Sequence, residues 1–304
     1  MTLKIIQPPF LRSGDEVGLI SPAFAIDEDK INSAVALLES WGYKVRVGRN
    51  VLKRNGPFAG SDKERLSDLQ EMTDNRSVKA VFCSRGGYGV SRIIEKADFG
   101  VLRKSPKWYI GFSDITVLHL WLRKVPGIIS LHAEMPLNYD NPERSEETFE
   151  TLKLALAGDY STCSWTGYSY RGREAEGELT GGNLSLVYSL IGTRAEPETK
   201  GKILFLEDIG EYFYHIDRML TSLKMAGKLK DLAALLIGGM NDMQDGKTAW
   251  GRSIEDTITD IVSEYEYPVF FNFPAGHIND NRAIYIGRKS LLKIKKEKLT
   301  LSFL

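Results

Sequence analysis

The sequence has very few cysteines and no long apolar run. Only two cysteines, Cys83 and Cys163, occur in 304 residues, which excludes a scaffold held together by disulfides. No stretch of about 18 apolar residues is present, so we expect no membrane-spanning helix. Residues 1–9 lack the apolar segment of about 7–15 residues that marks a signal peptide. These absences predict a cytoplasmic protein with reduced thiols.

An excess of charge of either sign is also missing. The 40 lysines and arginines balance 40 aspartates and glutamates, which gives a net charge of zero. Proteins that bind nucleic acids usually carry a basic excess, so we expect no nucleic-acid partner. Hydrophobic residues make up 42% and charged residues 26% of the chain, values typical of soluble globular proteins. The length predicts about two domains.

Strands and helices alternate through the first half of the chain. Helices are predicted to begin near Asp27, Ser61, Val90 and Ser113, and a further helix surrounds residues 149–156. The spacing of Ser61 and Glu64 is that of a capping box. Alternation of this kind predicts a parallel sheet covered by helices on both faces. The predicted strands cover residues 16–22, 43–47, 78–83, 108–112 and 127–131.

The pattern changes near residue 160, where we place the domain boundary. Residues 158–173 are polar and rich in Gly, Tyr and Ser. We therefore predict an N-terminal domain of residues 1–160 and a C-terminal domain of residues 161–304. The second half mixes predicted strands and helices. Its strands are at 202–206, 232–237, 268–271, 283–286 and 298–303, and its helices are near 184–191, 214–226 and 253–265.

A glycine-rich turn, Arg85-Gly86-Gly87-Tyr88-Gly89, follows the third predicted strand. Ligands of open parallel sheets bind outside the carboxyl ends of the strands, where this turn lies. Adjacent glycines allow backbone N–H groups to approach an anion or an oxyanion. The spacing fits neither the dinucleotide fingerprint nor the P-loop. Without further observations, a simple packing turn is an equally good interpretation.

A second turn, residues 110–115, places Ser113 between a strand and a helix. A nucleophile elbow presents its serine in this position, and the Asp114 amide would face the same space as an oxyanion donor. However, Ile115 stands where the elbow of α/β-hydrolases has its second glycine. The segment alone favours another interpretation, in which Ser113 only caps the helix.

A nucleophilic serine needs a base, and four histidines are available. His277 lies in a polar loop after a predicted strand, where catalytic groups are often found. His132 follows the fifth predicted strand and is a candidate for the lining of the pocket. His119 is more consistent with a packed or surface helix residue, and His215 with a structural or interface role. His277 is therefore the strongest candidate for the base.

The base needs an orienting carboxylate, and two candidates end one apolar strand. Glu207 and Asp208 are adjacent, so their side chains point to opposite faces of the sheet. Only one of them can face a catalytic histidine. The residues themselves leave this choice open.

Seven segments together resemble the LD-carboxypeptidases of peptidase family S66. This family includes the murein tetrapeptide carboxypeptidases and the microcin-immunity peptidases. Each segment is weak alone, but they occur in the family's order through nearly the whole chain. They are Phe58-Ala59-Gly60-Ser61-Asp62, Arg85-Gly86-Gly87-Tyr88-Gly89, Gly111-Phe112-Ser113-Asp114-Ile115-Thr116, Gly181-Gly182-Asn183-Leu184, Phe205-Leu206-Glu207-Asp208, Ile216-Asp217-Arg218-Met219-Leu220 and Pro274-Ala275-Gly276-His277.

The resemblance implies a Ser-Glu-His triad. Ser113 would be the nucleophile, His277 the general base and Glu207 the orienting acid. The backbone amides of Gly87 and Asp114 would form the oxyanion hole. The implied fold is α/β, with an N-terminal parallel-sheet domain that carries the nucleophile and a C-terminal β-rich domain that carries the acid and the base.

The resemblance further implies a cytoplasmic serine carboxypeptidase that cleaves an amide between an L-centre and a terminal D-amino acid. The expected reaction is release of D-Ala from murein tetrapeptides during cell-wall recycling, by a homodimer. Arg85, His132 and Asn183 are candidate substrate contacts. No metal or other cofactor is implied, since no cluster of possible ligands has metal-site spacing.

One segment departs from the family pattern. Many members have His-Gly-Pro-Met where this chain has His132-Ala133-Glu134-Met135. We expect Glu134 to alter the charge of the substrate pocket.

Three other functions compete with this interpretation. One is a peptidase of the same family that acts on peptidyl-nucleotide antibiotics, with Trp165 or Tyr168 as an aromatic platform. Another is a non-catalytic protein that binds small molecules. The last is a glutaminase-like amidotransferase, which would need cysteine at position 113.

Overall fold

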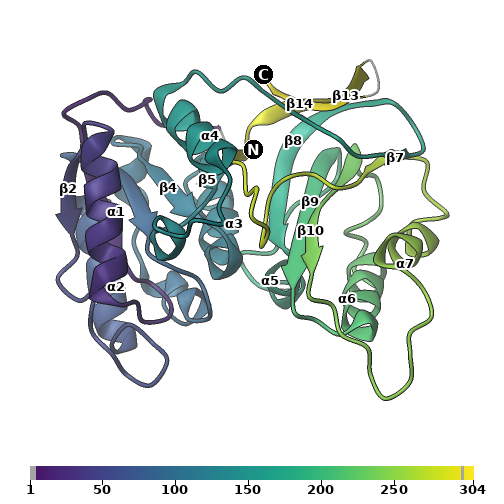
Figure 1. The fold of residues 1–304 in the computed structure, drawn as a ribbon, viewed down its shortest axis with the longest axis horizontal. Helices are drawn as coiled ribbons and strands as arrows, with labels where there is room; N and C mark the ends of the chain where they lie inside the picture. The colour runs from purple at the N-terminus through teal and green to yellow at the C-terminus, as the bar shows by residue number, and fades with distance from the viewer. Residues whose placement is uncertain (1–4, 296–297) are drawn as a thin grey trace. The chain divides into compact units, whose positions relative to one another are not determined.

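The alternating strands and helices of the first half contribute five strands to a six-stranded sheet (Figure 1). The computed structural model describes residues 5–295 and 298–304. The chain divides between Tyr160 and Ser161 into two compact units. Asn279–Gly287, which the sequence assigned to the C-terminal domain, packs in the first unit, and the second unit consists of Ser161–Ile278 and Arg288–Leu304. The reason is strand pairing across about 150 residues, which local patterns do not reveal.

The sheet of the first unit is parallel except at one edge. Its order is β12-β5-β4-β3-β1-β2, and β12 alone runs antiparallel to its neighbour, with Tyr285 opposite Leu131. The inner strands are buried on both faces, as expected of a parallel sheet covered by helices. The strands are β1 (Glu16–Ile20), β2 (Lys44–Val47), β3 (Val78–Cys83), β4 (Trp108–Gly111), β5 (Ser130–His132) and β12 (Ile284–Ile286).

Among its described residues, the first unit has four α-helices. They are α1 (Glu28–Ser40), α2 (Asp62–Asp74), α3 (Thr116–Lys124) and α4 (Glu146–Ala157). The predicted capping box of α2 is confirmed, because Ser61 and Glu64 exchange side-chain and backbone hydrogen bonds. The predicted helix after the glycine-rich turn is wrong. The chain instead forms two 3-10 turns, η1 (Val90–Arg92) and η2 (Ile94–Lys96), separated by Ile93 with φ −117°.

The described part of the first unit contains three further 3-10 turns. They are η3 (Gly100–Arg103), η4 (Ser113–Ile115) and η5 (Pro136–Asn138). The turn η4 connects β4 to α3, so the chain passes from strand to helix through Ser113.

The second unit contains a mixed eight-stranded sheet of order β6-β14-β13-β8-β9-β10-β11-β7. The strands β8, β9, β10 and β11 are parallel, and the remaining pairings are antiparallel. Helix α6 packs against α5 and α7. The elements are β6 (Thr162–Trp165), β7 (Ser169–Tyr170), β8 (Glu174–Asn183), α5 (Leu184–Ser189), β9 (Lys202–Ile209), α6 (Phe213–Met225), β10 (Ala234–Asn241), α7 (Ile254–Ile261), β11 (Val269–Phe270), β13 (Lys289–Lys295) and β14 (Lys298–Phe303).

The predicted α/β class, with a parallel-sheet unit followed by a β-rich unit, is confirmed. Among the described residues, no helix is long and apolar enough to cross a membrane.

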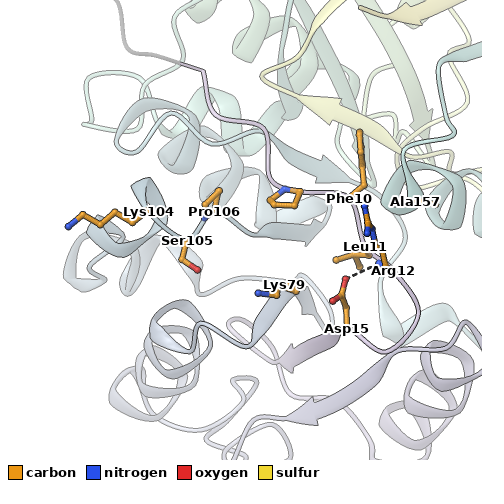
Figure 2. Close-up of a pocket in the computed structure, with 10 residues that line it drawn as sticks. Phe10, Leu11, Arg12, Asp15, Lys79, Lys104, Ser105, Pro106 and Ala157 are labelled. Atoms are coloured by element: carbon orange, nitrogen blue, oxygen red, sulfur yellow. Dashed lines mark hydrogen bonds between the residues drawn. The ribbon is translucent and has the colours of Figure 1, made fainter.

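A cavity of about 630 Å³ lies at the amino end of the first sheet (Figure 2). Asp15, Lys79 and Pro106, which line it, lie at or just before the starts of β1, β3 and β4. The Lys104 ammonium points away from Lys79 and Arg12, so these cations do not converge on one point (Figure 2). The cavity is thus at the edge opposite the turns that follow the strands.

Candidate active site

Ser113 lies in the strand-to-helix turn after β4. Its φ of 62° is in the left-handed region, which residues other than glycine seldom adopt. Strained backbone of this kind is concentrated at functional sites. Within the described residues, the serine side chain caps neither η4 nor α3. The helix-cap interpretation is therefore wrong, and the half-buried hydroxyl is placed by the backbone rather than by a cap.

The glycine-rich turn after β3 lies directly against this serine. A Cβ atom on Gly86 would stand 2.8 Å from Ser113 Cβ and 3.2 Å from the Asp114 backbone nitrogen. Gly87 is exposed and has a φ of 102°, which favours glycine. The turn therefore brings the exposed Gly87 backbone to the same sheet edge as Ser113 and the Asp114 amide.

His119 holds the end of the strand that leads to the serine. Its Nε2 lies 2.8 Å from the Gly111 carbonyl oxygen and its Nδ1 lies 2.8 Å from Ser130 Oγ. Burial lowers the pKa of His119 to about 4, so the ring is neutral near pH 7. A neutral ring donates a hydrogen bond through Nε2–H to the Gly111 carbonyl oxygen and accepts one at Nδ1 from the Ser130 hydroxyl. The predicted packed role is confirmed.

Two predicted substrate contacts also lie in the first unit. Arg85 is half-buried, and its Nη1 donates to the Ala25 carbonyl oxygen at 3.0 Å. His132 is fully buried, with its ring centroid 5.7 Å from that of Phe112, the residue before the serine. Their contact with a substrate stays a prediction.

Glu134 is buried within the first unit. Its carboxylate accepts hydrogen bonds from the Met135 backbone N–H at 3.0 Å, Asn138 Nδ2 at 2.9 Å and Asn281 Nδ2 at 3.2 Å. Arg144 Nε lies 3.2 Å from the same carboxylate and compensates its charge. These contacts argue against the expected change in pocket charge. Glu134 instead fastens the segment that contains Asn281 to the first unit.

In the second unit, Glu207 and His277 form a close pair. Glu207 Oε2 accepts from His277 Nδ1 at 2.7 Å and from the His277 backbone N–H at 3.2 Å. Glu207 is fully buried at the end of β9, whereas the His277 side chain is 19% exposed. A Cβ atom on Gly276 would lie 2.5 Å from Glu207 Oε2, so glycine is required beside the pair. With Nδ1–H donated to Glu207, Nε2 of the neutral ring carries the lone pair.

Asp208 faces the opposite side of β9. Its Oδ1 accepts from Asn183 Nδ2 at 2.9 Å, and its Oδ2 accepts from the Ser185 backbone N–H at 2.9 Å. Burial, with a further contribution from Glu207, raises the pKa of Asp208 to about 6. The choice that the residues left open thus has a structural answer: Glu207 contacts the histidine, and Asp208 supports the start of α5.

Two asparagines complete this part of the second unit. The Asn183 side chain accepts from the Leu186 backbone N–H at 3.3 Å and forms the N-cap of α5. Its contact with a substrate stays a prediction. Asn241 donates through Nδ2 to the His277 carbonyl oxygen at 3.0 Å. Sequence reasoning missed Asn241, although its place at the end of β10 is the signal that identified Glu207.

An apolar cavity of about 530 Å³ lies beside the histidine loop in the second unit. Asn241 and Ile278, which contact or adjoin His277, are among its lining residues. The remaining wall is mostly apolar and includes Phe213, Ile237, Met240, Met243, Ile254, Phe271 and Phe273.

Comparison with known families agrees with both halves of this arrangement. Residues 17–133 match the LD-carboxypeptidase N-terminal domain, and residues 176–292 match the LD-carboxypeptidase C-terminal domain. The chain belongs to the LD-carboxypeptidase family. Membership of this peptidase family makes the protein a hydrolase and removes the basis for a non-catalytic binding protein.

Relatives similar over most of their length carry related names. A Bacillus subtilis strain 168 protein named "Probable murein peptide carboxypeptidase" is 37% identical over 94% of this chain and 91% of its own. The murein tetrapeptide carboxypeptidase of Pseudomonas aeruginosa is 32% identical over 91% of this chain and 92% of its own.

Solved structures extend the comparison. The muramoyltetrapeptide carboxypeptidase of Oxalobacter formigenes is 30% identical with a TM-score of 0.85, over 95% of this chain and 98% of its own. The microcin C7 self-immunity protein MccF, solved with aspartyl sulfamoyl adenosine, has a TM-score of 0.89 over 98% of this chain and 99% of its own. Its identity is only 20%, so this second likeness concerns the fold alone.

Proposed function

We propose that this LD-carboxypeptidase family member is a serine carboxypeptidase that releases the terminal D-Ala from murein tetrapeptides. The observation that carries the proposal is the 2.7 Å hydrogen bond between Glu207 and His277, in a chain whose strained Ser113 occupies the nucleophile position of the family motif. The names of relatives with 30–37% identity support the murein substrate.

In the proposed mechanism, Ser113 Oγ attacks the carbonyl carbon of the L–D amide. His277 Nε2 takes the hydroxyl proton, and Glu207 holds the ring by its Nδ1–H and stabilises the imidazolium. The Gly87 and Asp114 amides donate hydrogen bonds to the oxyanion. The imidazolium then protonates the departing D-Ala amine, and an acyl-enzyme remains. Water, activated by the same histidine, hydrolyses the ester.

We infer that Arg85 binds the terminal carboxylate of the substrate. Its Nε is buried and has no hydrogen-bond partner among the described residues, so it offers a donor to an anion. The apolar cavity beside His277 offers room for a side chain of the peptide. His132 and Asn183 are further proposed contacts.

A second candidate within the family is cleavage of peptidyl-nucleotide antibiotics. The fold likeness to MccF and one exposed aromatic ring favour it. Tyr168 is 44% exposed and stacks on Phe271, with ring centroids 4.8 Å apart, whereas Trp165 is buried and unsuited as a platform. A nucleobase would stack on the exposed face of Tyr168.

One assay separates the two candidates. The wild type and Ser113→Ala are incubated with a murein tetrapeptide, the D-Ala-D-Ala pentapeptide and an aminoacyl sulfamoyl adenosine. We expect the wild type to release D-Ala from the tetrapeptide and the variant to release none. Cleavage of the adenosine compound alone would favour the second candidate. Equal release by the variant would contradict the assignment of Ser113.

We further propose that the enzyme acts in the cytoplasm as a homodimer. The small number of cysteines supports a reducing compartment. Light scattering after size-exclusion chromatography measures the oligomeric state, and a monomer at micromolar concentration would contradict the dimer.

A further inference from the structure

The guanidinium of Arg65 is buried in the first unit, an unusual place for a charged group. Arg65 belongs to α2 and is only 1% exposed. Its Nη1 donates to the backbone carbonyl oxygens of Pro22 at 2.8 Å and Gly89 at 3.0 Å, and its Nη2 pairs with Asp62. Pro22 follows β1 and Gly89 belongs to the turn after β3. One buried side chain thus joins the turns of two neighbouring strands.

The Asp114 carboxylate holds the same turn through its N–H groups. Asp114 is fully buried, and it accepts a hydrogen bond from the Val90 backbone N–H at 2.9 Å. The peptide group between Gly89 and Val90 is therefore held at both ends by opposite charges, its carbonyl by Arg65 and its N–H by Asp114. Gly89 has a φ of 148° and no side chain of its own to fix this conformation.

The turn held in this way is the one that touches the nucleophile. Gly86 lies so close to Ser113 that a Cβ atom would stand 2.9 Å from its Oγ. Gly87 comes next, and its amide is the proposed oxyanion donor. A shift of the turn would therefore move this donor relative to the serine.

We propose that Arg65 and Asp114 are positioning residues, which together fix the Gly86–Gly89 turn so that the Gly87 N–H is held ready for the oxyanion. This inference rests on the proposed function, because the clamp matters for catalysis only if the Gly87 N–H binds the oxyanion of the transition state. Asp114 then contributes twice, once through its own backbone amide and once through its side chain. A purely structural clamp would affect the stability of the fold and leave transition-state binding unchanged.

The variant Arg65→Met tests the clamp, because it keeps the length of the side chain and removes the guanidinium. With a murein tetrapeptide we expect kcat to fall about 10²-fold, since misplacing a catalytic group by about 1 Å has an effect of this size. We expect KM to change little. The affinity for a peptidyl boronic acid, which forms a tetrahedral adduct with a serine, should fall by a similar factor. The affinity for the tripeptide product should be retained.

Arg92→Met is the matched control. Arg92 pairs with the same Asp62 and lies over the same Phe58 ring as Arg65, but its side chain is 46% exposed. We expect kcat and boronate affinity close to those of the wild type. A folded Arg65→Met variant with wild-type kcat and boronate affinity, and only a lower melting temperature, would overturn the proposal.

If Arg65→Met does not fold, Asp114→Asn decides the question. It keeps the shape of the side chain and replaces one of its acceptor oxygens by a donor. We expect parallel losses of kcat and boronate affinity, and wild-type values for both would overturn the clamp. Wild-type protein is assayed alongside. Absence of D-Ala release by the wild type contradicts the proposed function and the clamp together, whereas wild-type release with unaffected variants contradicts the clamp alone.

Discussion

The candidate catalytic residues of the two units are held in place by different means. In the first unit, Ser113 and Gly87 take their positions from the backbone, and both have positive φ angles. In the second unit, His277 is oriented by side chains, with Glu207 on its ring and Asn241 on its carbonyl. The nucleophile half is therefore sensitive to added atoms. The acid–base half is sensitive to changes of charge that leave the shape unaltered.

The largest effect is expected from a substitution of the proposed nucleophile. Ser113→Ala removes the attacking oxygen and keeps the backbone, so kcat/KM should fall by about 10⁴- to 10⁶-fold. Release of D-Ala measures the loss. The melting temperature should change little, because the hydroxyl caps neither following helix in the described part of the chain. Activity within tenfold of the wild type would mean that another residue attacks.

The next largest effect is expected when the charge of Glu207 is removed without a change of its shape. Glu207→Gln keeps the size of the side chain but loses the carboxylate that accepts from His277 Nδ1. We expect kcat to fall by about 10²- to 10⁴-fold, since the wrong tautomer is favoured and the imidazolium is not stabilised. Asp208→Asn is the matched control on the other face of β9, and its loss should be much smaller. Equal losses in the two variants would contradict the assigned roles.

A smaller effect is expected when one methyl group is added to the glycine-rich turn beside Ser113. Gly86→Ala adds one carbon that would lie 2.8 Å from Ser113 Cβ, so the turn or the serine must move. We expect kcat to fall about 10²-fold for a displacement of about 1 Å. Gly246→Ala is the control, because the nearest atom to its added Cβ would be 3.8 Å away. Wild-type kcat for Gly86→Ala would show that the turn adapts without affecting catalysis.

The smallest effect concerns the pH dependence of stability in the second unit. The pKa of Asp208 is about 6 in the folded protein, because burial opposes ionisation, against 3.8 ordinarily. The folded state then binds the proton more tightly, so the stabilisation from the protonated carboxyl is complete below pH 3.8 and lost as pH rises through 6. Relative to Asp208→Asn, the wild type should lose about 2–3 kcal/mol of unfolding free energy between pH 4 and pH 7. Urea denaturation at several pH values measures this, and a constant difference would contradict it.

Local patterns predicted much of the first unit and less of the site. Periodicity located β1 and β3, and the Ser61–Glu64 spacing predicted the start of α2 correctly. By contrast, β8 contains three glycines and alternating glutamates, and β13 is rich in lysine, so neither was predicted. Their strand character depends on pairing with each other and with neighbours distant in the sequence.

Local sequence patterns predicted even less of the contacts around the candidate site. Asp114 was identified only through its backbone amide, because its position after the serine says nothing of where its carboxylate points. The partner of that carboxylate, the Val90 N–H, lies 24 residues earlier in the chain. The burial of Arg65 likewise results from packing between turns. The mostly polar sequence of α2 gives no sign that this arginine is buried.

The late position of strand β12 in the chain has a consequence for the folding of the first unit during translation. Ile284–Ile286 pairs with β5 and covers its outer edge. The other edge of β5 pairs with β4, the strand that leads to Ser113. On the ribosome, the first 160 residues emerge well before this covering strand has been synthesised. An uncovered edge invites pairing with other chains. A truncated chain that ends before residue 284 would therefore carry the proposed nucleophile on an incomplete sheet, prone to aggregation, and the first unit would be complete only after residues 279–287 have been synthesised.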